Sequence, residues 1–136
     1  KTSHWTQAMT QHILIVEDEA EIANIEQLSL EGFDLEITHF KYAAEALEHL
    51  QDAKPDLLVL DIGLPDMSGW QFLEACKADD LLPASCSVII TTAFSDPANR
   101  VIGKLQEVTR YLAKPFSPIT FKAIVVELLG LETDTD

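Results

Sequence analysis

Cysteine and basic residues are scarce in this chain of 136 residues, and long apolar runs are missing. The two cysteines, Cys76 and Cys86, are too few for a disulfide framework and have no spacing typical of a zinc site. This usage fits a reducing, cytoplasmic compartment. No apolar run approaches the roughly 20 residues that a membrane span needs. We therefore expect a soluble protein without a transmembrane segment.

Only 9 residues are Lys or Arg against 23 that are Asp or Glu, which gives a formal net charge of −14. A surface this negative repels phosphate backbones and anionic lipid, so direct binding to nucleic acid or membranes is not expected. A divalent cation or a basic protein partner would be attracted instead.

The length fits one compact domain. The first residues have no apolar core like that of a secretory signal, and we interpret residues 1–10 as a tag remnant or a disordered N-terminus, with Met9 as a candidate native start. The domain itself is expected over residues 11–131. An acidic tail at 132–136 follows it.

Short apolar runs alternate with helix-like segments, which predicts an α/β fold with a parallel sheet. The predicted strands are 13–16, 34–38, 57–60, 87–92 and 111–113. The first, third and fourth are continuously apolar, as is typical of central strands covered on both faces, and the other two are expected at the edges.

The predicted helices lie between and after these strands. One is expected over 20–31, where Ile22, Ile25 and Leu28 have helical spacing, and one over 42–52, whose start has no good cap. The third should begin with a capping box made by Ser68 and Gln71. The fourth and fifth each have Asp or Ser before a proline at the first helical position, and the fifth should end at Gly130.

Polar residues follow the carboxyl ends of these strands: Glu17, Asp18 and Glu19, then Asp61, Thr92 and Lys114. In a parallel sheet these ends meet at one edge, where ligands bind. Carboxylates crowded there would repel one another. A raised pKa of one of them or a bound Mg²⁺ would relieve this repulsion. A free carboxylate could then attack phosphorus, with lysine and threonine as donors to the phosphoryl group.

Four segments carry a resemblance to a known family: ILIVEDE, DLLVLDIGLPDMSG, IITTAF and YLAKPF. In their order and separation they resemble the response-regulator receiver domain, the phosphoacceptor of two-component signalling, over residues 11–131. The resemblance implies a (βα)5 fold with a doubly wound, flavodoxin-like parallel sheet of strand order 2-1-3-4-5.

The resemblance also implies roles for individual residues. Asp61 matches the phosphorylated aspartate, Lys114 the lysine of the site and Thr92 the hydroxyl that contacts the phosphoryl group. Thr92 and Tyr111 match the switch residues, although the Tyr111 ring could simply cover the core. A shift of the strand by one residue would bring Thr91 to the site in place of Thr92. The peptide bond between Lys114 and Pro115 is expected to be cis.

For the metal, the resemblance implies Mg²⁺, with Mn²⁺ as an alternative, held by Glu17, Asp18, Asp61 and the backbone carbonyl of Gly63. Two departures from the chemotaxis-type pattern lie near the site. Gly63 has no side chain to offer, and Phe94 is bulky. We expect Phe94 to limit the access of water and to lengthen the lifetime of the phosphoryl group.

The implied function is that of a signalling domain rather than an enzyme. It would accept a phosphoryl group from a phosphohistidine of a histidine kinase or histidine phosphotransfer protein, assist its own phosphorylation and dephosphorylation, and change the face made by the fourth helix, fifth strand and fifth helix. Glu107 and Arg110 alter the charge pattern for dimerisation through that face, so a monomer or weak dimer is expected.

Three alternatives remain. The first is a degenerate receiver that binds proteins without being phosphorylated. The second is a flavodoxin-like FMN protein, which the acidic EDEAE segment after the first strand disfavours because it repels phosphate. The third is an aspartate-nucleophile phosphatase, whose second aspartate would fall at Gly63.

Overall fold

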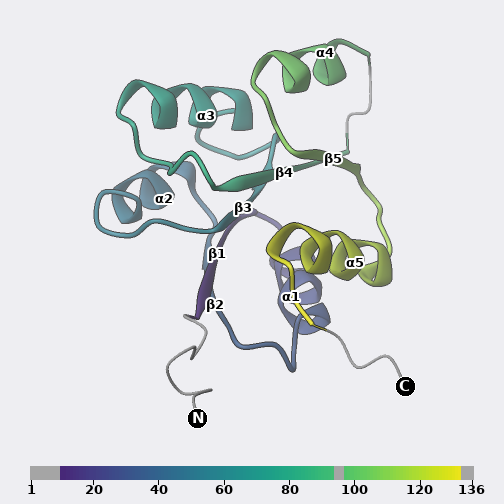
Figure 1. Cartoon of the computed structure of the whole chain (residues 1–136). Coiled ribbons are helices and arrows are strands. Elements are labelled where there is room, and N and C mark those ends of the chain that lie inside the picture. The colour runs from purple at the N-terminus through teal and green to yellow at the C-terminus, as the bar shows by residue number, and fades with distance from the viewer. Residues whose placement is uncertain (1–9, 94–96, 133–136) are drawn as a thin grey trace.

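The computed structural model describes residues 10–93 and 97–132, which form a parallel sheet of order β2-β1-β3-β4-β5 with helices on both faces (Figure 1). The strands are β1 (Gln11–Val16), β2 (Leu35–Phe40), β3 (Leu57–Asp61), β4 (Ser87–Thr92) and β5 (Arg110–Ala113). The helices are α1 (Ala20–Ser29), α2 (Ala43–His49), α3 (Gly69–Ala78), α4 (Pro97–Leu105) and α5 (Pro118–Leu129). The predicted fold class, strand order and edge strands are confirmed.

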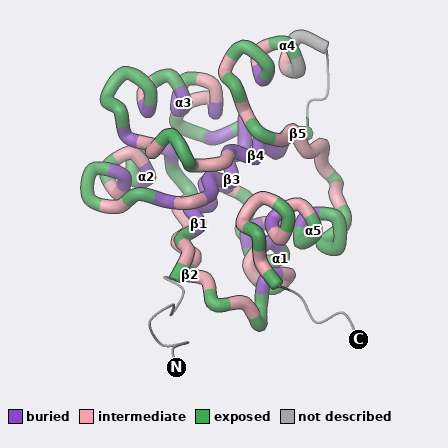
Figure 2. Tube along the Cα trace, viewed as in Figure 1, coloured by how far each residue is buried: buried purple, intermediate pink, exposed green. Residues whose placement is uncertain are grey.

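The sheet separates two apolar cores. Alternate residues of β3 point to opposite sides, so that Leu58 and Leu60 pack with α2 and α3, while Leu57 and Val59 pack with Phe121 of α5. Figure 2 shows the buried residues concentrated in the central strands between the two layers of helices. Burial on both faces explains why the central strands are continuously apolar rather than alternating.

Local signals set the ends of two helices as predicted. The Ser68 hydroxyl accepts a hydrogen bond from the Gln71 amide, and the Gln71 side chain accepts one from the Ser68 amide, which completes the capping box of α3. The Ser117 hydroxyl caps α5 by accepting a hydrogen bond from the Ile119 amide, and Gly130 ends this helix in the left-handed conformation with φ of 64°. The predicted cap of α4, at residues 95–96, lies outside the described residues.

The buried face of α1 differs from the predicted one. Ile25 and Leu28 are largely exposed, whereas Ala23, Glu26 and Leu30 are buried. Both sets have helical spacing, so the pattern identifies the helix but not the face that packs against α5 and the sheet. The helix also ends two residues earlier than predicted, and α2 covers only part of the predicted range.

The missing cap of α2 is supplied from another part of the chain. Asp66, in the turn after β3, accepts hydrogen bonds from the amides of Ala43 and Ala44, at 3.0 and 2.9 Å. Slight burial works in the opposite direction, but these backbone donors lower the pKa of the Asp66 carboxyl. The turn that follows β3 is therefore tied to the beginning of α2.

The cysteines and the lengths of the apolar runs were both singled out in the sequence. Cys76 and Cys86 are both free, and burial raises the pKa of each thiol to about 12. Among residues 10–93 and 97–132, no helix has the length and apolar character needed to cross a bilayer.

Candidate functional site

Asp61 is held rigidly at the carboxyl end of β3. The strand is paired on both sides, by β1 and β4, and the residue is only 5% exposed. The amide of Gly63 donates to Asp61 Oδ1 at 3.1 Å, and the amide of Ile62 donates to the Thr91 carbonyl. The start of α3 is bound to the same turn, because the Gly69 amide donates to the Ile62 carbonyl at 2.8 Å. These bonds fix where the carboxylate can lie.

Lys114 joins the carboxylates of two strands. Its Nζ lies 2.9 Å from Glu17 Oε1, 3.2 Å from Asp61 Oδ2 and 3.6 Å from Glu19 Oε2. Burial alone would lower the pKa of Lys114, but the hydrogen bond and charge of Glu17 and the charge of Asp61 raise it. The ammonium is therefore a permanent positive charge beside Asp61.

Backbone contacts bring Lys114 to this place. Its amide donates to the Thr92 carbonyl at 2.7 Å, which extends the pairing of β4 with β5 by one residue. The bond between Lys114 and Pro115 is cis, as the resemblance implied.

Glu17 is the most deeply buried acid of the site. It is 1% exposed, and its Oε2 accepts a hydrogen bond from the Glu19 amide at 3.1 Å. Burial raises the pKa of Glu17 to about 7, with Lys114 opposing the rise and the charge of Asp61 adding to it. His39 Nε2 donates to the backbone carbonyl of Glu17 at 2.7 Å, which fixes the chain where β1 ends.

The acidic cluster fits a hard divalent cation. Glu17, Asp18 and Glu19 can each offer one oxygen, and these oxygens lie within 4.8 Å of one another. Burial, followed by the charge and hydrogen bond of Asp61, raises the pKa of Asp18. Charge crowding of this kind is relieved by a cation with oxygen ligands, such as Mg²⁺. Glu19 was not among the predicted ligands, although it belongs to the same EDE run.

The two threonines at the end of β4 are both buried. Thr91 is paired with Asp61 in the sheet, and Thr92 lies one residue further along, beside Ala113. Thr91 Oγ1 has no hydrogen-bond partner. Because residues paired in register point to the same face, Thr91 competes with Thr92 for the role of hydroxyl donor.

Tyr111 and Phe94 are the other two residues expected to modulate the site. Tyr111 is half-buried, packs against the core on the α3 side and lines a groove of about 500 Å³ formed by residues of α4, β5 and the segment between them. Phe94 lies outside the described residues.

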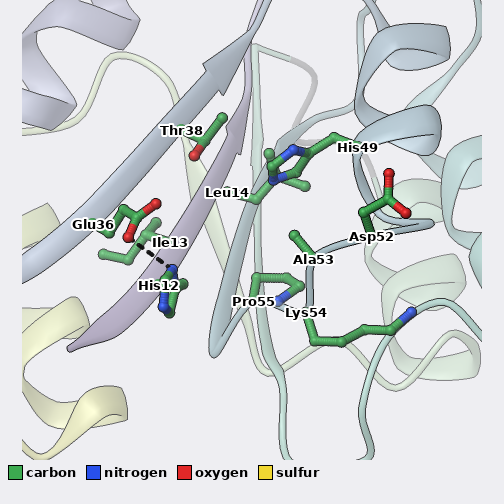
Figure 3. A pocket seen from close by; sticks show the side chains of 10 residues that line it. All are labelled: His12, Ile13, Leu14, Glu36, Thr38, His49, Asp52, Ala53, Lys54 and Pro55. Atoms are coloured by element: carbon green, nitrogen blue, oxygen red, sulfur yellow. Dashed lines mark ion pairs between the residues drawn. The ribbon is translucent and has the colours of Figure 1, made fainter. Parts of the chain in front are cut away.

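A second pocket, of about 280 Å³, lies at the opposite end of the strands (Figure 3). Among its polar groups, His12 and Glu36 pair with each other at 3.5 Å, and the Lys54 ammonium extends away from the pocket to the carbonyls of Leu50 and Leu81. Within the described part of the chain, the histidines here join no cluster of metal ligands. The group of acids that could hold a metal ion, Glu17 to Glu19, lies at the other end of the strands.

Comparisons with known proteins identify a matching family. A family model described as the response regulator receiver domain matches residues 13–126. The transcriptional regulatory protein CreB of Escherichia coli K12 is 36% identical over 119 residues, which cover 86% of this chain and 50% of CreB. The alkaline phosphatase synthesis transcriptional regulatory protein PhoP of Bacillus subtilis 168 is 32% identical over 121 residues, which cover 89% of this chain and 49% of PhoP. The chain thus spans about half the length of these curated relatives.

Solved structures give the same result. A CheY-like response regulator receiver domain protein from Methanospirillum hungatei JF-1 superposes with a TM-score of 0.79 at 27% identity, covering 90% of this chain and 95% of that one. The BeF3-activated receiver domain of DrrB, from Thermotoga maritima, has a TM-score of 0.78 at 25% identity and covers 90% of this chain and 100% of that one. The chain belongs to the response-regulator receiver domain family.

Proposed function

We propose that Asp61 is the phosphoryl acceptor of a two-component phosphorelay. The observation that carries this is the pairing of a buried strand-end carboxylate with a buried lysine, Asp61 Oδ2 to Lys114 Nζ at 3.2 Å, beside a cluster of further carboxylates. An Asp61 oxygen would attack the phosphorus of a phosphohistidine on a histidine kinase or phosphotransfer protein. The P–O bond forms as the P–N bond breaks, and the leaving imidazole nitrogen takes up a proton.

The neighbouring side chains have separate tasks in this step. Lys114 keeps its charge because the carboxylates raise its pKa, so it can neutralise the oxygens of the incoming phosphoryl group. A hydroxyl at the end of β4, Thr92 in our assignment, would donate to the same group. Mg²⁺ held by Glu17, Asp18, Asp61 and the Gly63 carbonyl would offset the charge of the carboxylates and of the phosphoryl oxygens.

The output is expected on the face made by α4, β5 and α5. Tyr111 lines the groove there, together with Val101, Lys104 and Arg110. Thr92 is followed by the segment that leads into α4, so a shift of its side chain toward a phosphoryl group could be passed to Tyr111 and the groove. The phosphoryl group would shift the population between two arrangements of this face.

Acetyl phosphate provides the direct test. With Mg²⁺ present, the intact mass of the chain should increase by one phosphoryl group, and the modification should map to the peptide that contains Asp61. Chelation of the cation with EDTA should prevent it. A chain that is folded and binds Mg²⁺ but takes up no phosphate from acetyl phosphate or from a phosphohistidine donor would contradict the proposal and favour the degenerate receiver.

The choice between the two threonines has its own prediction. Thr92→Ala should slow the phosphorylation by about 10- to 100-fold, because a donor to the phosphoryl oxygens is lost, whereas Thr91→Ala removes a hydroxyl without a hydrogen bond and should have little effect. The rate of phosphate uptake from acetyl phosphate is the measurement. The reverse result, with Thr91→Ala as the slow variant, would reassign the hydroxyl donor.

A further inference from the structure

One buried acid is not used by the site described above. Glu26, on the packed face of α1, is fully buried between Ala23 and Leu30 of the same face. Neither of its carboxyl oxygens has a hydrogen-bond partner. A buried carboxylate without a partner is costly, so such a group holds a proton instead of a charge.

The charges of the site nevertheless affect the pKa of Glu26. Burial is the main cause that raises its pKa to about 8; the charge of Glu17 adds to the rise, Lys114 lowers it and Asp61 adds a smaller increase. Within the part of the chain that the structure describes, no hydrogen bond or ion pair joins Glu26 to these groups. Glu26 is therefore linked to the acidic site through electrostatics.

The helix packed against α1 supplies no compensating charge. The buried residues of α5, Phe121 and Val125, are apolar. Its charged residues are engaged elsewhere, since Lys122 Nζ lies over the ring of Phe33 and Glu127 pairs with Arg110 at 2.6 Å. On α1 itself, Glu21 is exposed. Apart from burial, the charges that act on the pKa of Glu26 are therefore those of Glu17, Lys114 and Asp61.

We propose that Glu26 is a proton-binding site coupled to the acidic centre, so that a divalent cation bound there expels the proton of Glu26 to solvent and a phosphoryl group on Asp61 retains it. This inference rests on the proposed function for the identity of the two occupants. Only the O–H bond of the carboxylic acid breaks, and the proton passes to water. Coupling between the sites is reciprocal, as linkage requires.

The coupling gives the domain a response to pH. Below the pKa of Glu26, the neutral acid adds no repulsion toward a phosphoryl group, so retention of the phosphate is favoured. Above it, the additional negative charge favours the cation and disfavours the phosphate. The affinity of the acidic centre for the cation should therefore increase as the pH rises through the pKa of Glu26.

Proton release on binding of Mg²⁺ tests this coupling directly. Isothermal titration in two buffers with different ionisation enthalpies counts the protons released per cation, in wild type, in Glu26→Gln and in Glu21→Gln. Glu17 is present in all three proteins, so a difference found only with Glu26→Gln reports the contribution of the Glu26 carboxyl. At about pH 7.5, wild type should release roughly a third to a half of a proton more than Glu26→Gln. Glu21→Gln, which makes the same carboxyl-to-amide change on the exposed surface of the same helix, should match wild type.

A measurement on the unaltered protein guards against misfolding of the variant. The side-chain carboxyl carbon of Glu26, followed by NMR, should titrate at a lower pH when Mg²⁺ is present than when it is absent. Equal proton release by wild type and Glu26→Gln, or a Glu26 titration that Mg²⁺ does not move, would overturn the inference. If the chain instead shows this coupling but Asp61 takes up no phosphate, the proposed function fails and the proton site stands.

Discussion

Asp61→Asn should take up no phosphate from acetyl phosphate and Mg²⁺, while its fold becomes slightly more stable. The amide has no anionic oxygen to attack phosphorus, so the reaction loses its nucleophile. The same change removes one charge from the crowded carboxylates. Asp61 contributes to the raised pKa of Glu17, so its loss should let Glu17 ionise more readily, with a gain on the order of 1 kcal/mol at neutral pH.

The matched control is Asp66→Asn, in the same turn. Its carboxylate accepts two backbone hydrogen bonds at the start of α2. The variant should keep its phosphorylation but lose about 1 kcal/mol of unfolding free energy, as is usual when a cap is weakened. Intact mass and urea unfolding report the two quantities. Persistent labelling of Asp61→Asn would show that another residue is the acceptor.

Gly69→Ala should disrupt the structure around Asp61. A Cβ at this position would lie 2.8 Å from the Asp61 carbonyl oxygen and 2.9 Å from the Ile62 Cα. Both atoms belong to the backbone and cannot rotate away, and the Gly69 amide is bound to the Ile62 carbonyl. We expect a loss of roughly 2 to 4 kcal/mol, together with slower phosphorylation because the chain that carries Asp61 must move.

Gly103→Ala is the control for this change. Its Cβ would meet only side chains, the nearest being Val108 Cγ2 at 3.3 Å, with Trp70 and Tyr111 at 3.6 Å. Because alanine is a better helix former, the variant should be close to wild type in stability, within about 1 kcal/mol. Urea midpoints and phosphorylation rates of both variants are the measurements. If Gly69→Ala unfolds at the same urea concentration as wild type, the close approach of Gly69 to the end of β3 does not exclude a Cβ.

Local patterns in the sequence were sufficient to predict an α/β fold with a parallel sheet, and the family resemblance supplied the strand order. Continuous apolar runs identified the central strands, and Ser68 with Gln71 and Ser117 with Pro118 marked the starts of α3 and α5. These signals act over a few residues, so they can be interpreted without knowledge of the neighbours. The positions of the strand ends then brought Asp61, Glu17 and Lys114 to one edge of the sheet, where they lie in contact.

The parts that sequence reasoning missed depend on contacts between distant segments. The spacing of Ile22, Ile25 and Leu28 predicted a helix, but its packed face carries Glu26, which only the arrangement of α5 and the sheet reveals. The sequence offered one signal of this face: Glu26 lies three residues after Ala23 and four before Leu30, at helical spacing. Its apolar neighbours made this face as plausible as the other.

The cap that Asp66 places on α2 also affects the order in which the chain folds. The helix has 7 residues, too few to be stable by itself in water, where isolated helices shorter than about 12 residues are marginal. Its first amides are satisfied by a residue more than 20 positions later, beyond β3. We therefore expect α2 to remain incomplete, as the chain leaves the ribosome, until the turn after β3 has emerged. The second helix and β3 are then expected to form together, as one cooperative folding unit.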